Sequence, residues 1–508
     1  MLPPGPPPLP FVGNLFDIPK HKPWRGYRDL CAKYGDLVYL QALGQSMIVL
    51  GSANSAIEYL EKCSANTADR LPNPVIELSG QDVNFAHIRY DQWWRRHRRA
   101  FWQHFHPGVV SKYNPIQSAQ THNFLARLIE APSNLEAHIR FSLAAALVKL
   151  VYDIDVKDED DKIMKMVDVA ADAIVLSTPG HWAVEIFPFL RHIPAWFPGA
   201  GFQKIFAECK AANDHLRDVP FTEVKEALKR GDVRSSVASE LLNREGYHLP
   251  AKDEEILRNV CAVSVEGGTD TTASALKAFF LAMAIYPDVQ RRAQAELDAV
   301  VGHDRLPDFS DSPALVYVNA IIKEVLRWHL VVPLSIPHYT MEEDEVQGYF
   351  IPARTVLIPN VWAILHDPEA YDSPDEFRPE RFIRDGKLDP TVRDPVAFMF
   401  GFGRRRVPSV DASPPMSAHL GRYPSSWCRI CPGRYFAHAS LFIHIASVLH
   451  VFDIGPPLDE NGQPFKVQYE QGHGLLSNPE DCRCSIKVRS PGSLDLVLES
   501  QRESRATD

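Results

Sequence analysis

One segment, residues 253–286, restricts the fold more than any other part of the chain. Its pattern predicts a single long helix that is apolar on nearly all sides. A helix of this kind has to be buried, so other elements must surround it. The chain has 508 residues, 45% of them hydrophobic, which is enough to build such a core.

The rest of the pattern is mainly helical. Helical periods run from about residue 53 to 320. They include a surface helix at 288–302 and an amphipathic helix at 314–329, and a last core helix is expected at 433–452. Residues 35–51 alternate between glycines and predict a hairpin, and short strands and turns follow Pro333 up to about residue 365. The fold class is therefore mainly α with a small β portion, α+β. No linker divides residues 21–508, so we expect a single domain behind a proline-rich spacer at residues 1–20.

Charge and composition exclude several classes of protein. A net charge of −10 argues against general binding of nucleic acid. Eight scattered cysteines suit reduced thiols better than a disulfide framework. We find no stretch typical of a transmembrane helix and no signal peptide. A stiff spacer at residue 3 has nothing in front of it to space, so we expect either a soluble protein or an anchor that is missing from this sequence.

Glu324 and Arg327 lie three residues apart on a predicted helix and can form an ion pair. A lone pair at this spacing is usually a solvated surface pair. Apolar neighbours favour a partly buried pair here, and such a pair needs a further partner. Arg381 in "FRPERF" offers one.

The segment "VEGGTDTTAS" interrupts the long apolar helix. Gly267 and Gly268 each cost about 1 kcal/mol relative to alanine. Missing side chains give a ligand room to approach the backbone, and an acid and an alcohol follow at Asp270 and Thr271. The alternative is a chance kink with a threonine bonded back to its own helix.

Two further candidates involve a basic helix and a cysteine. Trp94 and Arg98 share a helix face, which is either a solvated basic face or a cradle for carboxylates. Cys431 precedes Pro-Gly and a helix start, where backbone amides and the helix dipole favour the thiolate. A buried structural cysteine is the alternative.

The order of these motifs, from Trp94 to Gly433, resembles that of the cytochrome P450 family, the haem–thiolate monooxygenases. The resemblance covers essentially the whole chain and is of the fungal microsomal type. It implies the cytochrome P450 fold over residues 21–508 as one catalytic domain, with haem b (iron protoporphyrin IX) as the cofactor.

The resemblance also assigns roles to the residues. Cys431 would be the axial thiolate and the metal ligand, which favours O–O cleavage. Asp270 and Thr271 would be the catalytic pair that relays protons for the cleavage of dioxygen. Glu324, Arg327 and Arg381 would form a structural triad that steadies the cysteine loop. The expected haem-binding residues are Trp94, Arg98, Gly267, Gly268, His338, Phe400, Arg405, Arg429, Cys431 and Gly433.

The partners follow from the same resemblance. The chain has no Gly-rich dinucleotide fingerprint, so electrons from NADPH would arrive through NADPH–cytochrome P450 reductase, with cytochrome b5 as an optional second donor. The family places a monomer on the cytosolic face of the endoplasmic reticulum membrane, and a soluble cytoplasmic form stays open. The substrate should be small and lipophilic. For residues 184–202 three alternatives stay open: an edge of the substrate channel, a contact with a membrane surface, or a plain packed loop.

The cysteine motif is split by 24 residues. The family has a phenylalanine seven residues before the cysteine, a glycine four before and an arginine two before. Skipping residues 406–429 brings Phe400, Gly403 and Arg405 into this register, and skipping 405–428 retains Arg429 instead. A loop this much longer costs only about 1.3 kcal/mol in closure entropy, but a structureless excursion of that length is unusual in a compact domain.

Two interpretations of the insertion follow. It is either a genuine surface insertion or unspliced sequence carried into the chain, and we favour the second. The leading function is a monooxygenase for a small lipophilic substrate in secondary metabolism. One alternative is a haem–thiolate isomerase or dehydratase, against which the Asp270–Thr271 pair argues. Another is a catalytically impaired haem-binding or haem-free protein that results from the insertion.

Overall fold

The computed structural model describes residues 1–507 except 177–179, 181, 233–234, 246–248 and 404–429. The chain divides into two compact units, and each is described by itself. Unit 1 comprises Met1–Pro72, Pro333–Ile364 and Ala397–Cys431, and unit 2 comprises Asn73–Val332, Leu365–Val396 and Pro432–Asp508. Whether the two units together form the one catalytic domain expected over residues 21–508 depends on how they join, so the single domain stays a prediction.

The predicted hairpin begins the sheet of unit 1. β1 (Leu37–Ala42) and β2 (Gln45–Leu50) are antiparallel, and the two residues between them, Leu43 and Gly44, both have positive φ angles of 49° and 89°. Two-residue hairpin turns of this kind need positive φ at both positions. β2 pairs in parallel with β6 (Val356–Pro359), which pairs antiparallel with β3 (His338–Tyr339), so the strand order is β1-β2-β6-β3.

The other elements of unit 1 are short, apart from the first helix. They are α1 (Pro23–Tyr34), α2 (Ala53–Ala56), the π-helix η1 (Ile57–Lys62), α3 (Ser64–Thr67), β4 (Asp344–Val346), β5 (Tyr349–Ile351) and, at the boundaries with unit 2, α15 (Val361–Leu365) and α16 (Val396–Met399). The short strands expected after Pro333 are therefore present.

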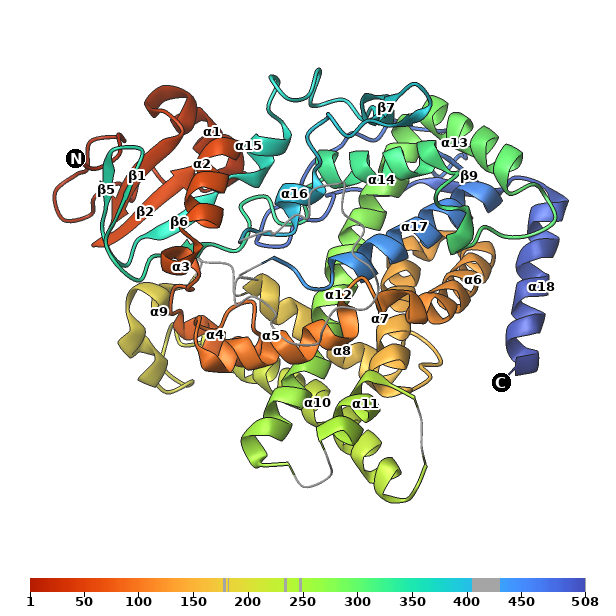
Figure 1. Ribbon diagram of the computed structural model, residues 1–508, viewed down its shortest axis with the longest axis horizontal. Helices are drawn as coiled ribbons and strands as arrows, with labels where there is room; N and C mark the ends of the chain where they lie inside the picture. The colour runs from red at the N-terminus through yellow and green to blue at the C-terminus, as the bar shows by residue number, and fades with distance from the viewer. Residues whose placement is uncertain (177–179, 181, 233–234, 246–248, 404–429, 508) are drawn as a thin grey trace, which may run out of the picture. The chain divides into compact units, whose positions relative to one another are not determined.

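α12 (Ala251–Ile285) is the central helix of unit 2 and corresponds to the predicted helix at 253–286. It packs against α5, α7, α8, α10, α11, α13, α14 and α17, and Figure 1 shows it running between several of these helices. Side chains all around α12 are buried, including Val260, Val265 and Phe279. The uniformly apolar pattern thus reflects contact with neighbours on every side.

The remaining helices of unit 2 are α4 (Pro74–Leu78), α5 (Gln92–Phe105), α6 (Asn114–Glu130), α7 (Leu135–Tyr152), α8 (Lys162–Leu176), α9 (Ala183–Ile186), α10 (Phe202–Lys229), α11 (Val237–Glu245), α13 (Pro287–Val300), α14 (Val316–Trp328), α17 (Arg434–Val451) and α18 (Pro491–Thr507). Short 3-10 helices are η2 (Gln81–Val83), η3 (Val110–Tyr113), η4 (Pro132–Asn134), η5 (Pro188–His192), η6 (Phe309–Asp311) and η7 (Pro379–Phe382). Its strands are β7 (Ile383–Arg384), β8 (Lys387–Leu388), β9 (Phe452–Gly455) and β10 (Ser485–Val488), which form the antiparallel pairs β7–β8 and β9–β10.

Two of the longer helices, α1 and α18, were not predicted. α17 matches the expected core helix at 433–452, but α18 follows it at the end of the chain and packs on α6 and α17. Val497 is buried on α18, whereas Leu498 next to it is largely exposed. A helix with so few buried apolar side chains leaves only a weak periodic pattern in the sequence.

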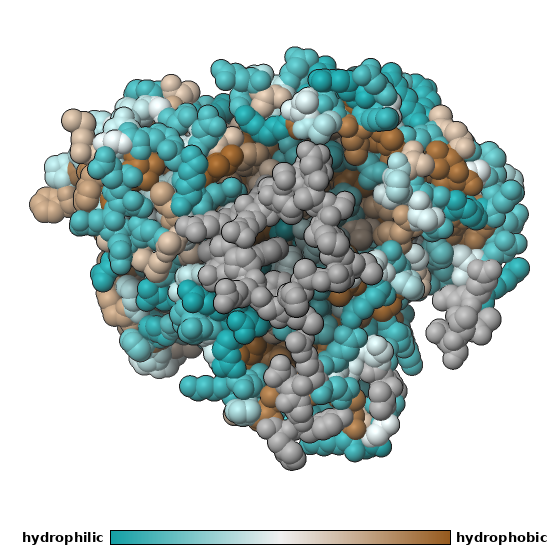
Figure 2. Space-filling model, viewed as in Figure 1, coloured by the Kyte–Doolittle hydropathy of each residue, from teal (hydrophilic) through white to brown (hydrophobic). Residues whose placement is uncertain are grey.

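The face of the molecule in Figure 2 is mainly hydrophilic, as expected for a chain with a net charge of −10. In unit 2, the segment 184–202 carries exposed apolar side chains, with Phe189 and Trp196 65% and 80% exposed. This exposure does not fit the alternative of a plain packed loop. Among the residues described, no helix has the length and the apolar character that a membrane crossing requires.

Candidate active site

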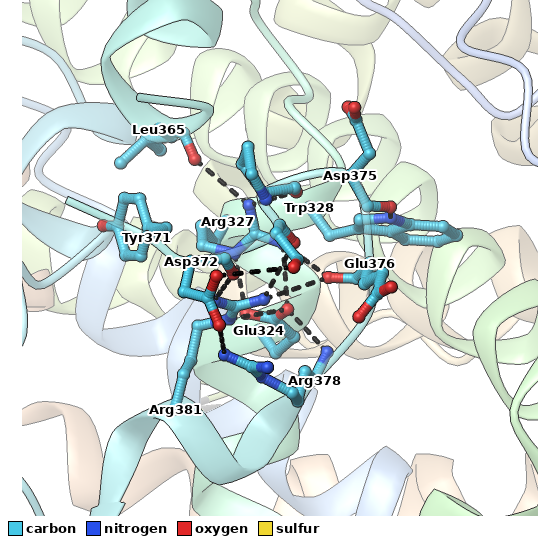
Figure 3. Close-up of polar contacts among 12 residues, drawn as sticks. Glu324, Arg327, Trp328, Leu365, Tyr371, Asp372, Asp375, Glu376, Arg378 and Arg381 are labelled. Carbon is cyan, nitrogen blue, oxygen red and sulfur yellow. Dashed lines mark hydrogen bonds and ion pairs between the residues drawn. The ribbon is translucent and has the colours of Figure 1, made fainter. Parts of the chain in front are cut away.

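Glu324 and Arg327 form a fully buried ion pair on α14. Both side chains are 0% exposed, and Arg327 Nε and Nη2 donate to the two carboxylate oxygens of Glu324 at 2.7 and 2.8 Å. Arg381 adds a third contact, with its Nε 3.2 Å from Glu324 Oε1. Figure 3 shows the three side chains converging. The sequence-based choice of a buried rather than a solvated pair therefore agrees with this geometry.

Both arginines also hold the irregular chain that follows α15. Arg327 donates to the backbone carbonyls of Leu365, Pro374 and Glu376, and Arg381 donates to those of Asp372, Ser373 and Glu376. The backbone N–H of Arg378 donates to Glu324 Oε1 at 2.7 Å. A segment without regular secondary structure is thus held by charge-assisted hydrogen bonds, which are stronger than neutral ones.

In unit 1, the two halves of the cysteine motif meet. The backbone N–H of Cys431 donates to the carbonyl oxygen of Phe400 at 2.7 Å, although 30 positions separate them in the sequence. Cys431 is half-buried. Two glycines after Phe400, Gly401 and Gly403, have positive φ angles of 87° and 150°, so the chain turns sharply there.

The two glycines of α12 have different surroundings. A Cβ atom on Gly268 would lie 2.7 Å from Leu147 Cδ1, so this glycine allows α7 and α12 to approach closely. A Cβ atom on Gly267 would meet no heavy atom within 4 Å. Only Gly267 therefore lies on an open side of the helix. The expectation that both glycines make room for a ligand holds better for Gly267, because packing alone accounts for Gly268.

Asp270 and Thr271 face different partners. The Thr271 hydroxyl donates to the carbonyl of Gly267 at 2.8 Å, the back-bonding that the sequence left as an alternative. Asp270 Oδ1 lies 2.9 Å from Arg140 Nε of α7, and Arg140 also pairs with Asp168 of α8 at 2.9 Å. Burial raises the pKa of Asp270, and Arg140 opposes that shift. Its second oxygen, Oδ2, is buried and has no hydrogen-bond partner in the described part of the chain.

The three side chains expected to grip carboxylates are buried. Trp94 Nε1, the single N–H of the indole ring, donates to the carbonyl of Phe85 at 2.9 Å, and Arg98 is buried on the same helix, α5. In unit 1, His338 Nδ1 lies 2.8 Å from the carbonyl of Thr67. If Nδ1 is the donor, Nε2 carries a proton only in the charged ring. A carboxylate that binds the Trp94 indole N–H would thus have to displace the Phe85 carbonyl. The assignments of Trp94, Arg98 and His338 as haem-binding residues stay predictions.

The remaining expected positions are Gly433, which is the N-cap of α17, and the two arginines at the edges of the insertion. Arg405, Arg429 and the whole segment 406–429 lie outside the described residues. The predictions for them stay untested.

A model of the cytochrome P450 family matches residues 3–406 of the chain. Cytochrome P450 monooxygenase COX1 of Coprinopsis cinerea is 39% identical over 498 residues, covering 96% of this chain and 92% of that protein. The chain belongs to the cytochrome P450 family. This confirms the resemblance found from the motif order and the mainly α fold with a small β portion.

Further relatives of this P450 also come from fungi. Cytochrome P450 monooxygenase claR of Ampulloclitocybe clavipes is 36% identical, covering 100% of this chain and 90% of its own. Tryptamine 4-monooxygenase of Psilocybe cyanescens is 35% identical, covering 98% and 94%. The names agree with the predicted fungal-type monooxygenase. The family match ends at residue 406, where the insertion begins, but coverage of 96% or more means that similarity resumes beyond it.

The family implies haem b, and the residues of this P450 fit that group. A cysteine thiolate is one of the ligands that hold haem iron in proteins, and Cys431 is a half-buried cysteine two residues before the N-cap of α17. The open side of α12 at Gly267 has space that a Cβ atom would enter without contact. Cys431 would hold the iron, and Gly267 would border the space beside the helix.

Sequence reasoning missed Arg140, the partner of Asp270, and Glu266, the residue directly before Gly267. Each had a signal, because Arg140 is a charge within the apolar run of α7 and Glu266 is a carboxylate within the apolar run of α12. Their partners come from distant parts of the chain, so the sequence pattern could not name them.

Proposed function

We propose that this P450 transfers one oxygen atom from dioxygen to a small lipophilic substrate in fungal secondary metabolism, with Cys431 as the haem thiolate ligand. Electrons come from NADPH through a separate NADPH–cytochrome P450 reductase, with cytochrome b5 as an optional donor. The monooxygenase names of the relatives support the reaction class. The substrate is proposed from the apolar character that binding sites of this kind usually have.

One observation carries the proposal for this particular chain. The Cys431 amide donates to the Phe400 carbonyl, so the halves of the ligand motif meet in unit 1 despite residues 406–429. This supports a ligand motif that stays assembled in the chain as given, whichever of the two interpretations of the insertion applies.

When bound, a thiolate-ligated haem supplies the activation and cleavage of dioxygen. The protein has to supply protons and hold the substrate. The Thr271 hydroxyl donates a hydrogen bond to the Gly267 carbonyl oxygen, with 2.8 Å between the two oxygen atoms, on the open side of the helix. Asp270 has a raised pKa, which suits a group that takes up and releases a proton. To serve Thr271, Asp270 must move away from Arg140 or exchange protons through Oδ2, which has no hydrogen-bond partner among the described residues.

Glu324, Arg327 and Arg381 are proposed to support the cysteine loop. Their network is centred on the fully buried Glu324–Arg327 pair and holds the chain from Leu365 to Arg378 by many hydrogen bonds. Such a network acts by keeping the backbone in place, so its role is structural rather than chemical.

A location at the cytosolic face of the endoplasmic reticulum is proposed from the family. The exposed apolar side chains Phe189 and Trp196 support contact with a membrane surface. We propose a monomer as the working form.

The test is turnover with isotopically labelled dioxygen. The chain as written and a variant lacking residues 406–429 are each incubated with NADPH, a fungal reductase and a panel of lipophilic compounds, starting with tryptamine, which one relative's name includes. We expect a product that contains one labelled oxygen atom and depends on NADPH. An isomerised or dehydrated product formed without NADPH would favour the alternative haem–thiolate chemistry. Activity in the deletion variant alone would show that the insertion impairs the enzyme.

A Thr271→Ala variant provides the matched control. It should keep its haem and consume NADPH but form less product for each NADPH oxidised, because the hydroxyl proton is lost. Equal product yield in this variant would remove Thr271 from the proposed relay.

A further inference from the structure

A buried carboxylate lies directly before the open glycine of α12 and has no role in the site described above. Glu266 is 5% exposed, and its side chain meets the loop that joins α4 to α5. Gln81 Nε2 donates to Oε1 of Glu266 in a short hydrogen bond, and Asn84 Nδ2 lies 3.4 Å from Oε2. Both amides are themselves buried, so the contact is shielded from water.

The amide side chains also bind one another and α10. Asn84 Nδ2 donates to Gln81 Oε1 at 3.1 Å, and Gln81 Nε2 lies 3.4 Å from Asn213 Oδ1 of α10. Asn213 Nδ2 donates to the carbonyl of Ser79 at 2.8 Å. Residues from the loop, α10 and α12 thus form one connected buried network, which we call the Glu266 cluster (Ser79, Gln81, Asn84, Asn213 and Glu266).

The backbone of the loop lies close to α10 at this point. Gly80 has a φ angle of 79°, and a Cβ atom there would lie 3.2 Å from Lys210 Cα and 3.3 Å from Asn213 Cβ. Larger residues rarely adopt this φ, and a side chain would also force the loop away from the helix. The close approach shows that the loop is seated at a defined position.

The same loop is held at its other end. Trp94 Nε1 of α5 donates to the carbonyl of Phe85 at 2.9 Å. Residues 79–85 are therefore fastened by Glu266 to α12, by Asn213 to α10 and by Trp94 to α5. Among these anchors, Glu266 is the one whose side chain accepts hydrogen bonds from two buried amides, those of Gln81 and Asn84.

The anchor on α12 is next to the candidate site. Gly267 follows Glu266 at once, and the Thr271 hydroxyl rests on the Gly267 carbonyl. A buried carboxylate is costly, and replacing such groups by apolar residues is often neutral for stability. A role in positioning accounts for its presence better than a role in stability.

We propose that Glu266 is a positioning residue that seats loop 79–85 beside the open side of α12 and thereby sets how tightly this P450 binds its substrate. The effect on substrate rests on the proposed function, whereas the seating of the loop does not. Replacing Glu266 should therefore release the loop and weaken binding, while leaving the chemistry of a bound substrate almost unchanged.

The first test is hydrogen exchange of the full haem-supplemented chain, read from peptides that cover residues 79–85. Glu266→Leu removes both acceptors, and Glu266→Gln places an amide donor where an acceptor is needed. Both variants should exchange about tenfold faster in this loop, the equivalent of about one hydrogen bond. Glu255→Gln removes the same charge from an exposed position of α12 and should leave the loop unchanged.

A charge-swapped variant separates positioning from damage to the fold. Gln81→Glu combined with Glu266→Gln restores a carboxylate–amide pair in the reverse sense and should recover much of the protection. Unchanged exchange in both single variants would overturn the proposal. So would fast exchange throughout α12 in every Glu266 variant, because that would show a general loss of structure.

The second test measures binding with 1-phenylimidazole, a small lipophilic azole that changes the haem spectrum. Its Kd should rise about tenfold in Glu266→Leu and stay unchanged in Glu255→Gln, and kcat for any turned-over compound should change much less than KM. Equal Kd values in the two variants, with the loop released, would overturn the link to binding. If the parent chain shows no haem spectrum at all, the proposed function fails, whereas the exchange experiment still decides the role of Glu266.

Discussion

The two adjacent glycines of α12 offer a matched pair of substitutions. Alanine has a helix propensity about 1 kcal/mol better than that of glycine, and this gain applies equally at both positions. At Gly267 the new methyl group meets no heavy atom within 4 Å. Gly267→Ala should therefore raise the free energy of unfolding by up to about 1 kcal/mol.

At Gly268 the same methyl group overlaps with Leu147. It would lie 2.7 Å from Cδ1 and 3.4 Å from Cδ2, and Leu147 is buried, so it can yield only by changing its rotamer or by pushing α7 away from α12. Overpacking of this kind costs about 1–3 kcal/mol. Because the propensity gain cancels between the variants, Gly268→Ala should be less stable than Gly267→Ala by about 1–3 kcal/mol.

The assay is urea unfolding followed by far-ultraviolet circular dichroism, with the m values of the two variants compared. Adding Leu147→Ala to Gly268→Ala should remove most of the overlap. Stabilities that agree within about 0.5 kcal/mol would show that α7 and α12 do not depend on the glycine for their close approach. Gly267→Ala should also lose turnover although it is the more stable protein, because it fills the open side of the helix.

Three further predictions concern titratable and charged side chains. Glu324→Gln leaves the buried Arg327 guanidinium without a charged partner and should lower the free energy of unfolding by about 3–5 kcal/mol. The urea midpoint and the haem content measure this change. A loss below about 1 kcal/mol would contradict this account of the pair. Arg140→Leu removes the group that opposes the raised pKa of Asp270, so that pKa should rise further. The acidic limb of the pH profile of product formation should move to higher pH, and an unmoved limb would separate Asp270 from proton delivery. Burial, aided by Asp270 and opposed by the amides of Gln81 and Asn84, raises the pKa of Glu266 from 4.5 to about 7. The folded protein thus holds this proton more firmly, so the stabilisation is complete below about pH 4.5 and is lost as the pH rises to about 7, by at most about 3 kcal/mol. A wild-type stability curve parallel to that of Glu266→Gln across this range would contradict the assignment. Lys210→Met removes an exposed cation of α10 that pairs with Asp214, and it serves as the charge control.

Short-range patterns carried most of what could be predicted. The long apolar run of α12 and the spacing of Glu324 and Arg327 are local features, and both the helix and the pair occur as expected. Contacts between distant segments could not be read in this way. Leu147 against Gly268 and Arg140 against Asp270 depend on how α7 packs on α12, which no local period encodes.

The same limit applies to Trp94. The sequence shows that Trp94 and Arg98 share a helix face. The hydrogen bond from the Trp94 indole N–H to the Phe85 carbonyl, however, depends on the path of the preceding loop. Polar residues in an apolar helix were the available signal for Glu266 and Arg140. That signal marks a residue that needs a partner, without naming the partner.

The ferrous–carbon monoxide spectrum tests the central claim most directly, because its Soret band is red-shifted only when a thiolate holds the iron. The full chain should show this band, and Cys428→Ser, three residues from the proposed ligand, should keep it. Cys431→Ser should abolish it. A red-shifted band that persists in Cys431→Ser would contradict the assignment of Cys431 as the haem ligand and the function proposed from it.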